Sequence, residues 1–391
     1  MATVTQVIDI LAVAQAAGLP LYPIQGGRQY TTRCWMCDYS PHGADRKVKG
    51  HLTIRPDLGV FRCPRCGYSG NAWTMANDLF STEQAKEVVR RAGGYSGPQW
   101  IDNPVADIKT RDAVYRALLK KLALSPTHRE NLKERGLPDD IIDKRQYKSL
   151  VGWDSTRGIC NLLLKEGYPL EGIPGFFHDK DNQWVFMTMP GFLIPIEDEV
   201  GRIQGFQIRV DDEYRSYLAM KGKNDIGKYI YFSSTGRKKG CSSGALIHVA
   251  VPENKNLKDY RVWFTEGPLK ADIAARYTNI PFLGVPGVSV YRQAAQKAED
   301  LGIKRTAVAY DMDIRENPFV QQAEIELLKE LYRRGISAVP VNWHRDYGKG
   351  IDDAAVCIAN HQIPIPTEIL ERVFKPDQKA VLEVSYRLKL Q

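Results

Sequence analysis

The chain has 391 residues, of which 43% are hydrophobic and 26% are charged, a balance that excludes a largely disordered protein. Lys and Arg outnumber Asp and Glu by 54 to 46, and the net charge of +8 favours a polyanionic partner such as a nucleic acid. No run of apolar residues is long enough to span a membrane and the first residues do not form a signal peptide, so we expect a cytoplasmic protein that binds no membrane.

A short amphipathic helix is predicted over residues 4–19, and a longer one over residues 72–92. The stretch Gly93–Pro98 reads as a linker, because glycine, serine and proline interrupt the helical pattern. The predicted divisions of the chain are a zinc-ribbon domain (1–95), a linker (96–109), a helical connector with a basic, mixed α+β subdomain (110–255), a parallel α/β domain (256–365) and a short tail (366–391).

Two cysteine pairs near the amino terminus are the strongest single signal in the chain. Cys34 and Cys37 form one C-x-x-C motif, Cys63 and Cys66 form another, and 25 residues lie between the two motifs. Four thiolates at this spacing can complete the tetrahedral shell of one structural zinc ion. A strand-like segment at 59–62, before the second motif, favours a zinc ribbon.

Aromatic and basic residues lie between and beside these cysteines. Trp35 stands between two predicted zinc ligands, and Arg62 and Arg65 flank Cys63. Stacking of an unpaired base on an aromatic ring contributes about 1–3 kcal/mol, and arginine adds phosphate contacts. These three residues are therefore predicted to contact single-stranded nucleic acid, whereas Phe61 and Trp73 are expected in the small core of the ribbon.

The last third of the chain alternates apolar strands with helical segments, the pattern of a parallel α/β sheet. The predicted strands cover residues 261–265, 280–285, 306–310 and 337–341. Acidic residues follow three of these strands: Glu266, Asp311 with Asp313, and Asp352 with Asp353. Ligands of α/β proteins bind at the carboxyl ends of the strands, and hard carboxylate oxygens suit Mg²⁺ or Mn²⁺. One such motif alone is more often a solvated loop, but their combination favours a divalent-metal site.

The order of four motifs resembles a Toprim domain: Glu266-Gly267, Gly284–Gly287, Asp311-x-Asp313 and Lys349–Asp353. A Toprim domain that follows a four-cysteine ribbon resembles the DnaG-type primases of bacteria and phages. The basic, strand-rich region over residues 190–234 is also similar to the amino-terminal catalytic subdomain of that family.

The resemblance implies a role for each matching residue. Glu266 would be the general base or a metal ligand, Asp311 and Asp313 the main ligands of a catalytic Mg²⁺ or Mn²⁺, and Asp352 and Asp353 an outer acidic pair. The residues that would face nucleotide or template phosphates are Arg209 and Lys228, with Lys238 and Lys239 as further candidates.

The chain departs from the family at Lys270. Primases of this type usually carry an aspartate four residues after the leading glutamate, and here a lysine stands at that position. Asp272 lies two residues later, on another face of the predicted helix. Lys270 therefore implies either the loss of one metal ion or a direct contact between lysine and a phosphate group.

The predicted function is DNA-template-dependent synthesis of short RNA primers from NTPs. Residues 222–228 match a phosphate-binding G-x-x-x-x-G-K loop, but Tyr229 follows where such a loop needs Ser or Thr, so a replicative helicase is expected to be a separate partner. This favours a phage or another mobile element as the source. The alternatives are a Toprim nuclease and a catalytically decayed single-stranded-DNA-binding replication factor.

Overall fold

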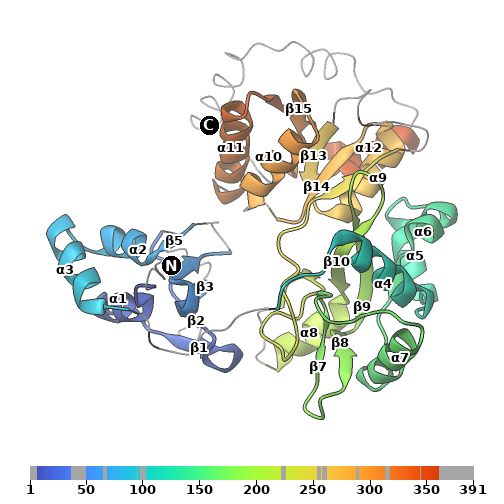
Figure 1. Ribbon diagram of the computed structural model, residues 1–391. Helices are drawn as coiled ribbons and strands as arrows, with labels where there is room; N and C mark the ends of the chain where they lie inside the picture. Colours follow the sequence, from blue (N-terminus) through green and yellow to red (C-terminus); the bar gives the residue numbers. More distant parts are fainter. Residues whose placement is uncertain are drawn as a thin grey trace. The chain divides into compact units, whose positions relative to one another are not determined.

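Figure 1 shows the computed structural model, which describes residues 7–36, 50–64, 68–94, 96, 103–221, 226–252, 257, 262–287, 290–312, 318–343 and 345–360. The chain forms two compact units, an amino-terminal unit (residues 1–101) and a carboxy-terminal unit (residues 102–391). Each unit is described by itself. The boundary between them falls within the predicted linker, although the first helix of the second unit already begins at Ile108.

An antiparallel sheet forms the centre of the amino-terminal unit. Its strands, in spatial order, are β1 (Tyr22–Ile24), β2 (Gln29–Thr32), β3 (Leu52–Arg55), β4 (Val60–Arg62) and β5 (Ser69–Asn71). Leu52, Ile54 and Phe61 are buried, as expected where alternate residues of a strand point to one face. The prediction that Trp73 lies in this core is wrong, because its side chain is 42% exposed on the helix that follows β5. The helix predicted over residues 4–19 is shorter, α1 (Ile10–Ala16), and Asp9 caps it by accepting hydrogen bonds from the backbone N–H groups of Leu11 and Ala12.

The single helix predicted over residues 72–92 is wrong, because two helices occupy this segment. They are α2 (Ala72–Leu79) and α3 (Thr82–Ala92). Ser81 adopts an extended backbone between them and forms a reciprocal capping box with Gln84, which starts a new helix. The helical period continues across this break, and so the apolar pattern alone did not reveal it.

The carboxy-terminal unit begins with a region of helices and an antiparallel sheet. The helices are α4 (Ile108–Lys120), α5 (Pro126–Glu134), α6 (Asp139–Arg145), α7 (Trp153–Lys165) and α8 (Asp212–Met220). The sheet has the order β11 (Tyr229–Tyr231), β10 (Ile203–Val210), β9 (Gly191–Glu197) and β6 (Lys148–Ser149), and a separate hairpin pairs β7 (Phe176–His178) with β8 (Trp184–Phe186). This arrangement confirms the predicted mixed α+β region.

A second sheet, which we call the parallel sheet, follows in the chain. Its order is β12 (His248–Ala250), β14 (Phe282–Val285), β13 (Val262–Glu266), β15 (Arg305–Val308) and β16 (Ser337–Pro340). All neighbouring pairs are parallel except β12 with β14 at one edge. The predicted parallel α/β region is confirmed, with strand ends that differ from the prediction by one or two residues.

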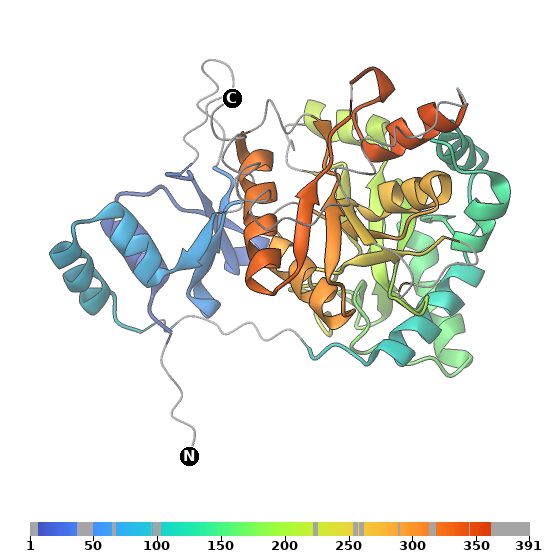
Figure 2. The same ribbon diagram turned by 90° about the horizontal axis from the view of Figure 1, so that it is seen from above.

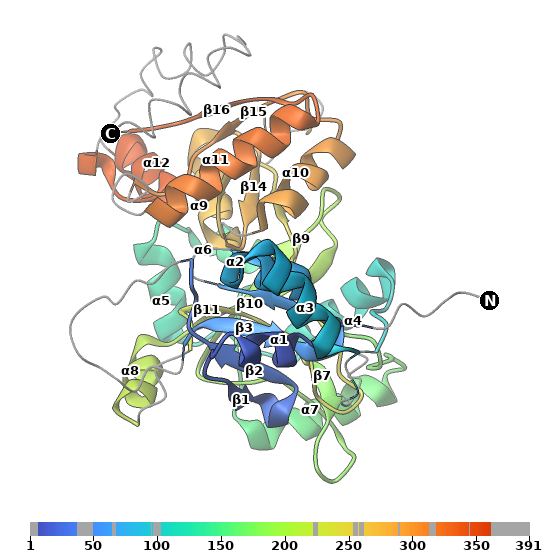
Figure 3. The same cartoon turned by 90° about the vertical axis from the view of Figure 1, so that its left-hand side faces the viewer.

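Helices cover both faces of the parallel sheet, as in doubly wound α/β folds. One face carries α10 (Tyr291–Asp300) and α11 (Pro318–Arg333), and the other carries α9 (Pro268–Thr278) and α12 (Ile351–Asn360). Figure 3 shows α10 and α11 lying across the sheet, and in Figure 2 the strands run between the two pairs of helices. No helix in the described ranges is both long and apolar enough to cross a membrane.

A buried polar network joins α9 to the antiparallel sheet and its helices. The carboxylate of Asp272, which is 3% exposed, accepts hydrogen bonds from the hydroxyl of Tyr147 (2.6 Å) and pairs with Arg145 (3.1 Å). His248 accepts a hydrogen bond from the backbone N–H of Glu197 at Nδ1, so its Nε2 can donate to Asp272, 3.1 Å away. Burial alone would raise the pKa of Asp272, but Arg145, His248 and Tyr147 outweigh that effect, and the pKa lies below its usual value.

We predict that Asp272→Asn lowers the free energy of unfolding of the carboxy-terminal unit by about 2–3 kcal/mol, because Arg145, His248 and Tyr147 lose the buried carboxylate that they contact, while Arg145 keeps its ion pair with Glu197. The pKa of Asp272 is lower in the folded protein than in the unfolded chain. Ionised Asp272 therefore stabilises the fold above pH ~4, and this stabilisation is lost as the pH falls through the pKa of the folded state. Denaturant unfolding at pH 7 and at pH 3 measures both effects. The control is Asp139→Asn, which removes an exposed partner of Arg129 and should cost about 1 kcal/mol or less. Equal losses for the two variants would contradict the prediction.

Candidate functional site

Glu266 and Asp311 lie at the carboxyl ends of adjacent strands. Glu266 is the last residue of β13, and the pairing of Phe264 with Val308 places the chain after β15 beside it. The prediction that β15 runs directly into Asp311 is wrong, because the strand ends at Val308 and Asp311 follows two non-strand residues. Asp311 is held there because the next residue, Met312, donates its N–H to the backbone oxygen of Lys349 (2.9 Å).

Two glycines allow α9 to start directly behind Glu266. Gly267 has a φ of +80°, a conformation that costs glycine little, and it precedes the first turn of α9. A Cβ on Gly284 would lie 2.8 Å from the backbone oxygen of Gly267, so only glycine permits this approach of β14 to the helix. The first turn of α9 therefore presents Lys270 to the same side as the strand ends.

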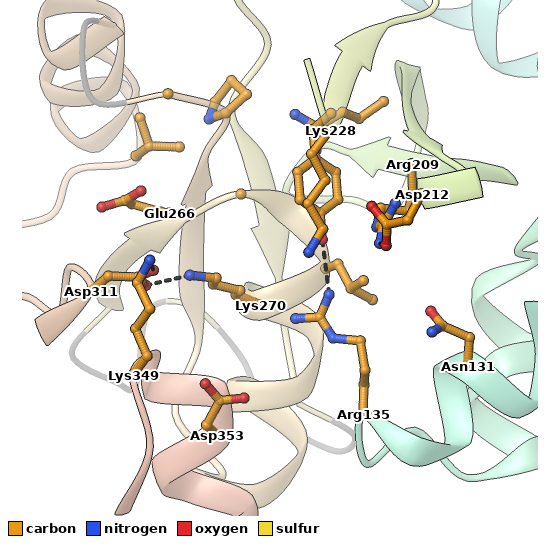
Figure 4. Close-up of a pocket in the computed structure, with 17 residues that line it drawn as sticks. Asn131, Arg135, Arg209, Asp212, Lys228, Glu266, Lys270, Asp311, Lys349 and Asp353 are labelled. Carbon is orange, nitrogen blue, oxygen red and sulfur yellow. Dashed lines mark hydrogen bonds and ion pairs between the residues drawn. The ribbon is translucent and has the colours of Figure 1, made fainter. Parts of the chain in front are cut away.

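These residues border a pocket of about 630 Å³ between the two sheets of the carboxy-terminal unit (Figure 4). Among the residues that the structure describes, its charged lining residues are the cations Arg135, Arg209, Lys228, Lys270 and Lys349 and the carboxylates Asp212, Glu266, Asp311 and Asp353. Glu266 and Asp311 thus lie across one cavity from Arg209 and Lys228, while Lys270 and Lys349 lie on the acidic side.

Asp311 is engaged by two lysines. Lys270 forms an ion pair with Oδ1 of Asp311, and Nζ of Lys349 lies 3.6 Å from Oδ2. Burial alone would lower the pKa of Lys270, but Asp311, Asp352 and Glu266 outweigh it and raise that pKa above its usual value. Lys270 is therefore charged at neutral pH and lies among the acidic residues (Figure 4).

Asp352 does not line the pocket, since Arg135 covers it. Arg135 donates to Asp352 (2.9 Å) and to the hydroxyl of Tyr229 (2.8 Å). Burial raises the pKa of Asp352, and its neighbours Lys270 and Arg135 counteract only part of this rise. The predicted outer acidic pair is consequently divided, because Asp353 is exposed and lines the pocket while Asp352 is buried in an ion pair.

Two predicted phosphate-binding residues form the opposite wall. Arg209 on β10 is 8% exposed, pairs with Asp212 (2.6 Å) and stacks over the ring of Tyr229 at 5.7 Å. Lys228, just before β11, is exposed at the pocket. The strand that follows Lys228 agrees with the rejection of a phosphate-binding loop, which requires a helix at this point.

The other two predicted lysines do not reach the pocket. Lys238 donates to Asn182 (2.6 Å) and Lys239 pairs with Glu171 (2.7 Å), and neither lines the cavity. Asp313 lies outside the described residues. The site thus contains Glu266, Asp311, Asp353, Arg209, Lys228 and Lys270 of the predicted set.

Sequence reasoning missed Arg135 and Asn131, which come from α5 and the turn after it. The turn reaches the site because Gly136 has a φ of +97°, and a Cβ there would lie 2.6 Å from Val356 of α12. Tyr277 of α9 also donates to the backbone oxygen of Gly136 (2.7 Å). No local sequence motif identifies these two residues as part of the site. The dipeptide Arg135-Gly136 is a weak indication, because a glycine can mark a place where the backbone packs closely against another segment.

The donor atoms of the pocket match a hard divalent cation in kind. Glu266 and Asp311 offer carboxylate oxygens, the ligands that Mg²⁺ and Mn²⁺ prefer. In the conformation described, however, the described residues include no group of three His, Cys, Asp or Glu side chains arranged to hold a metal ion. A dication at Asp311 would have to share or replace the contacts of Lys270 and Lys349.

In the amino-terminal unit, Cys34 and Cys63 are buried, at 3% and 0% exposure, while Cys37 and Cys66 lie outside the described residues. Trp35 packs against Phe61 with ring centroids 5.0 Å apart, and its indole N–H donates to Asp78 (3.2 Å). Trp35 therefore also helps to hold the first cysteine motif on α2. Arg62 is exposed and remains a predicted contact for single strands, and Arg65 lies outside the described residues.

A further carboxyl group is buried near Glu266. Glu324 on α11 is 3% exposed, and burial together with the charge of Glu266 raises its pKa to about 8. Glu324 is thus protonated in the folded protein at neutral pH, which keeps a second negative charge away from this side of the site.

No protein-family model matches the chain. A curated DNA primase of Lactococcus lactis subsp. lactis (strain IL1403) is 25% identical over 237 residues, which are 58% of this chain and 35% of that protein. The match thus spans about a third of the relative's length. This sequence similarity confirms the resemblance to DNA primases that the motifs predict.

Solved structures of primases are also similar to the chain. The zinc-binding and RNA polymerase domains of the Aquifex aeolicus primase are 18% identical, with a TM-score of 0.49 and coverage of 94% of this chain and 82% of that chain. The RNA polymerase domain of Mycobacterium tuberculosis primase DnaG is 14% identical, with a TM-score of 0.45 and coverage of 72% and 99%.

We predict that Glu324→Gln stabilises the protein at pH 8 and leaves its stability nearly unchanged near pH 4. The folded carboxyl keeps its proton up to about pH 8, whereas the unfolded chain releases it near pH ~4, so the wild type loses stability between these values, on the order of 3–5 kcal/mol in total. Denaturant unfolding at both pH values, without added divalent cation, measures the difference. Glu326→Gln, two residues away and paired with Lys329, is the control and should show no such gain. A gain that is the same at both pH values would refute the explanation.

Proposed function

We propose that this protein is a DNA primase that synthesises short RNA primers from NTPs on a single-stranded DNA template, with Mg²⁺ or Mn²⁺ at the pocket of the carboxy-terminal unit. The observation that carries the proposal is the pocket itself, in which Glu266 and Asp311 face the cations Arg209 and Lys228. The sequence similarity to a curated DNA primase supports the same reaction.

The charge pattern suits a nucleoside triphosphate. The guanidinium of Arg209 donates to Asp212 and to the backbone oxygen of Val210 and lies over the ring of Tyr229, so it is held in place and would offer only its remaining N–H groups to phosphate oxygens. Lys228 is exposed at the pocket and can follow a flexible triphosphate. Arg135 adds positive charge deeper in the cavity but is already committed to Asp352 and Tyr229, so its contribution is mainly to the electrostatic field.

The carboxylates would serve the reacting end of the primer. Glu266 and Asp311, with Asp313 as a predicted third ligand, would hold the dication, which when bound lowers the barrier to attack of a 3′-hydroxyl on the α-phosphate. Glu266 lies at the end of a buried strand and is therefore positioned rigidly, as a general base or a ligand requires. The cations across the pocket would orient the triphosphate so that its pyrophosphate end leaves along the basic wall.

The amino-terminal unit would bind the template. Its four cysteines are proposed to hold one structural zinc ion, and Trp35, Arg62 and Arg65 to contact unpaired DNA.

We further propose that the protein acts in the cytoplasm with a separate replicative helicase, in a phage or other mobile element.

Zinc is predicted at one ion per chain in the purified protein, measured by elemental analysis. Cys63→Ser should lower the zinc content to near zero, because removal of one of four thiolates disrupts a closed tetrahedral site. Cys160→Ser changes a buried cysteine of α7 in the other unit and should leave the zinc content unchanged. A wild-type protein free of zinc after purification without chelators would contradict the zinc ribbon.

RNA synthesis is the direct test of the proposal. Labelled NTPs are incubated with mixed-sequence single-stranded DNA and Mg²⁺ or Mn²⁺, and the products are separated by length. Wild type should yield short oligoribonucleotides, and Asp311→Asn or Glu266→Gln should reduce their yield on the order of 100-fold or more, as for loss of one strong charge interaction in an active site. Lys329→Ala, on the exposed side of α11, should retain activity.

Two results would contradict the primase proposal. A template shortened in a metal-dependent way, without RNA product, would identify a nuclease. A template that is bound but stays intact, with no RNA formed under any cation, would identify a single-strand-binding replication factor.

A further inference from the structure

Lys270 occupies the centre of the acidic side of the pocket. Its ammonium forms an ion pair with Asp311. The same ammonium and a carboxylate oxygen of Asp352 both lie close to Gly350, since a Cβ added to this glycine would be 3.4 Å from the nitrogen and 2.2 Å from the oxygen. The side chain of Lys270 is 21% exposed and that of Asp311 is 7% exposed, so the pair is shielded from water. Lys349, whose side chain is 60% exposed, approaches the second oxygen of Asp311 at 3.6 Å and is the looser of the two contacts.

This placement makes Lys270 a competitor of any cation that binds Asp311. An ammonium group and a dication repel each other, and both need the same carboxylate oxygens. The carboxyl group of Asp352 cannot replace Asp311 as a ligand without losing its ion pair with Arg135. In the absence of another anion, the pocket therefore favours Lys270 over the dication.

A triphosphate changes this balance because it offers Lys270 a new partner. Lysine has a flexible four-carbon stem and a compact charge, so its ammonium can move from a carboxylate to a nearby phosphate without rearrangement of the helix. Lys270 lies in the first turn of α9 and lines the same cavity as Arg209 and Lys228, which are the proposed phosphate contacts. Transfer of Lys270 to phosphate would release Asp311 for the cation.

We propose that Lys270 couples the two ligands of the site: it holds Asp311 until a nucleoside triphosphate arrives, and only then does Asp311 bind the dication tightly. The proposal rests on the proposed function, since it assumes that the pocket binds a triphosphate. Because coupling of two ligands is reciprocal, the dication must strengthen nucleotide binding by the same factor as the nucleotide strengthens metal binding. Lys270 would thus prevent the cation from occupying the site without substrate.

Binding of Mn²⁺ alone is the first test, measured by the electron paramagnetic resonance signal of free Mn²⁺ with zinc-loaded protein. Lys270→Gln should bind Mn²⁺ on the order of 10-fold more tightly than wild type, because the competing charge is gone. Lys270→Arg keeps the charge and should remain close to wild type. Lys329→Gln removes the same charge from an exposed site on α11 and controls for net charge.

The second test measures the coupling itself. The dissociation constant of a non-hydrolysable nucleoside triphosphate is determined with and without Mn²⁺ for wild type and for Lys270→Gln. The Mn²⁺–nucleotide complex formed in solution is the same for both proteins, so it cancels in the comparison. The strengthening of nucleotide binding by Mn²⁺ should be on the order of 10-fold greater in wild type than in the variant.

The results separate this proposal from the proposed function. Equal Mn²⁺ affinity and equal coupling in wild type and Lys270→Gln would overturn the role of Lys270, even if wild type makes RNA. The expected coupling without RNA synthesis would support Lys270 and contradict the primase. Lys270→Met, of similar length and also uncharged, must reproduce the result for Lys270→Gln, and a circular dichroism spectrum equal to that of wild type excludes unfolding of either variant as the cause.

Discussion

The position of α9 is the constraint on which the site depends. This helix is buried along most of its length, with Leu269, Ala271, Ala274 and Ala275 at most 2% exposed. It packs against the parallel sheet on one side and contributes Leu269 and Ile273 to a core shared with α5, α6 and β9. Because residues two positions apart point to nearly opposite faces of a helix, α9 can present Lys270 to the pocket and Asp272 to the buried network. The helix thereby fixes the distance between the acidic and the basic walls.

The buried charges near the site are arranged in pairs. The ion pairs are Asp272 with Arg145, Asp352 with Arg135, and Asp311 with Lys270. Glu324 needs no positive partner at neutral pH, because it keeps its proton and is uncharged. Such an arrangement follows from the high free-energy cost of an isolated buried charge. The exposed cations of the pocket, above all Lys228, are the ones that we propose to bind the triphosphate. The acidic motifs thus form part of a site that carries at least as much positive as negative charge.

The sequence predicted the strands of the parallel sheet well, because each is a short buried apolar run that ends in a turn signal. It also identified the acidic residues after those strands, since the topology of a parallel sheet brings strand ends together. It does not predict which of several similar residues reach the pocket, because contacts between distant segments decide this. Lys238 and Lys239 have the same chemistry as Lys228, yet they pair with Asn182 and Glu171 away from the pocket. Arg135 enters the site through the packing of Gly136 against α12, a contact between residues far apart in the chain.

The sequence by itself therefore determined the order of the elements, the acidic strand ends and the resemblance to primases, because these depend on local periodicity and on motifs with fixed spacing. Only the tertiary structure decided which charges face one another. It separated Asp352 from Asp353, placed Lys270 on Asp311 and set Arg209 opposite both. The physical reason is that the partner of a charged side chain is chosen by distance and burial in the folded molecule, and neither quantity is encoded in the spacing of residues along the chain.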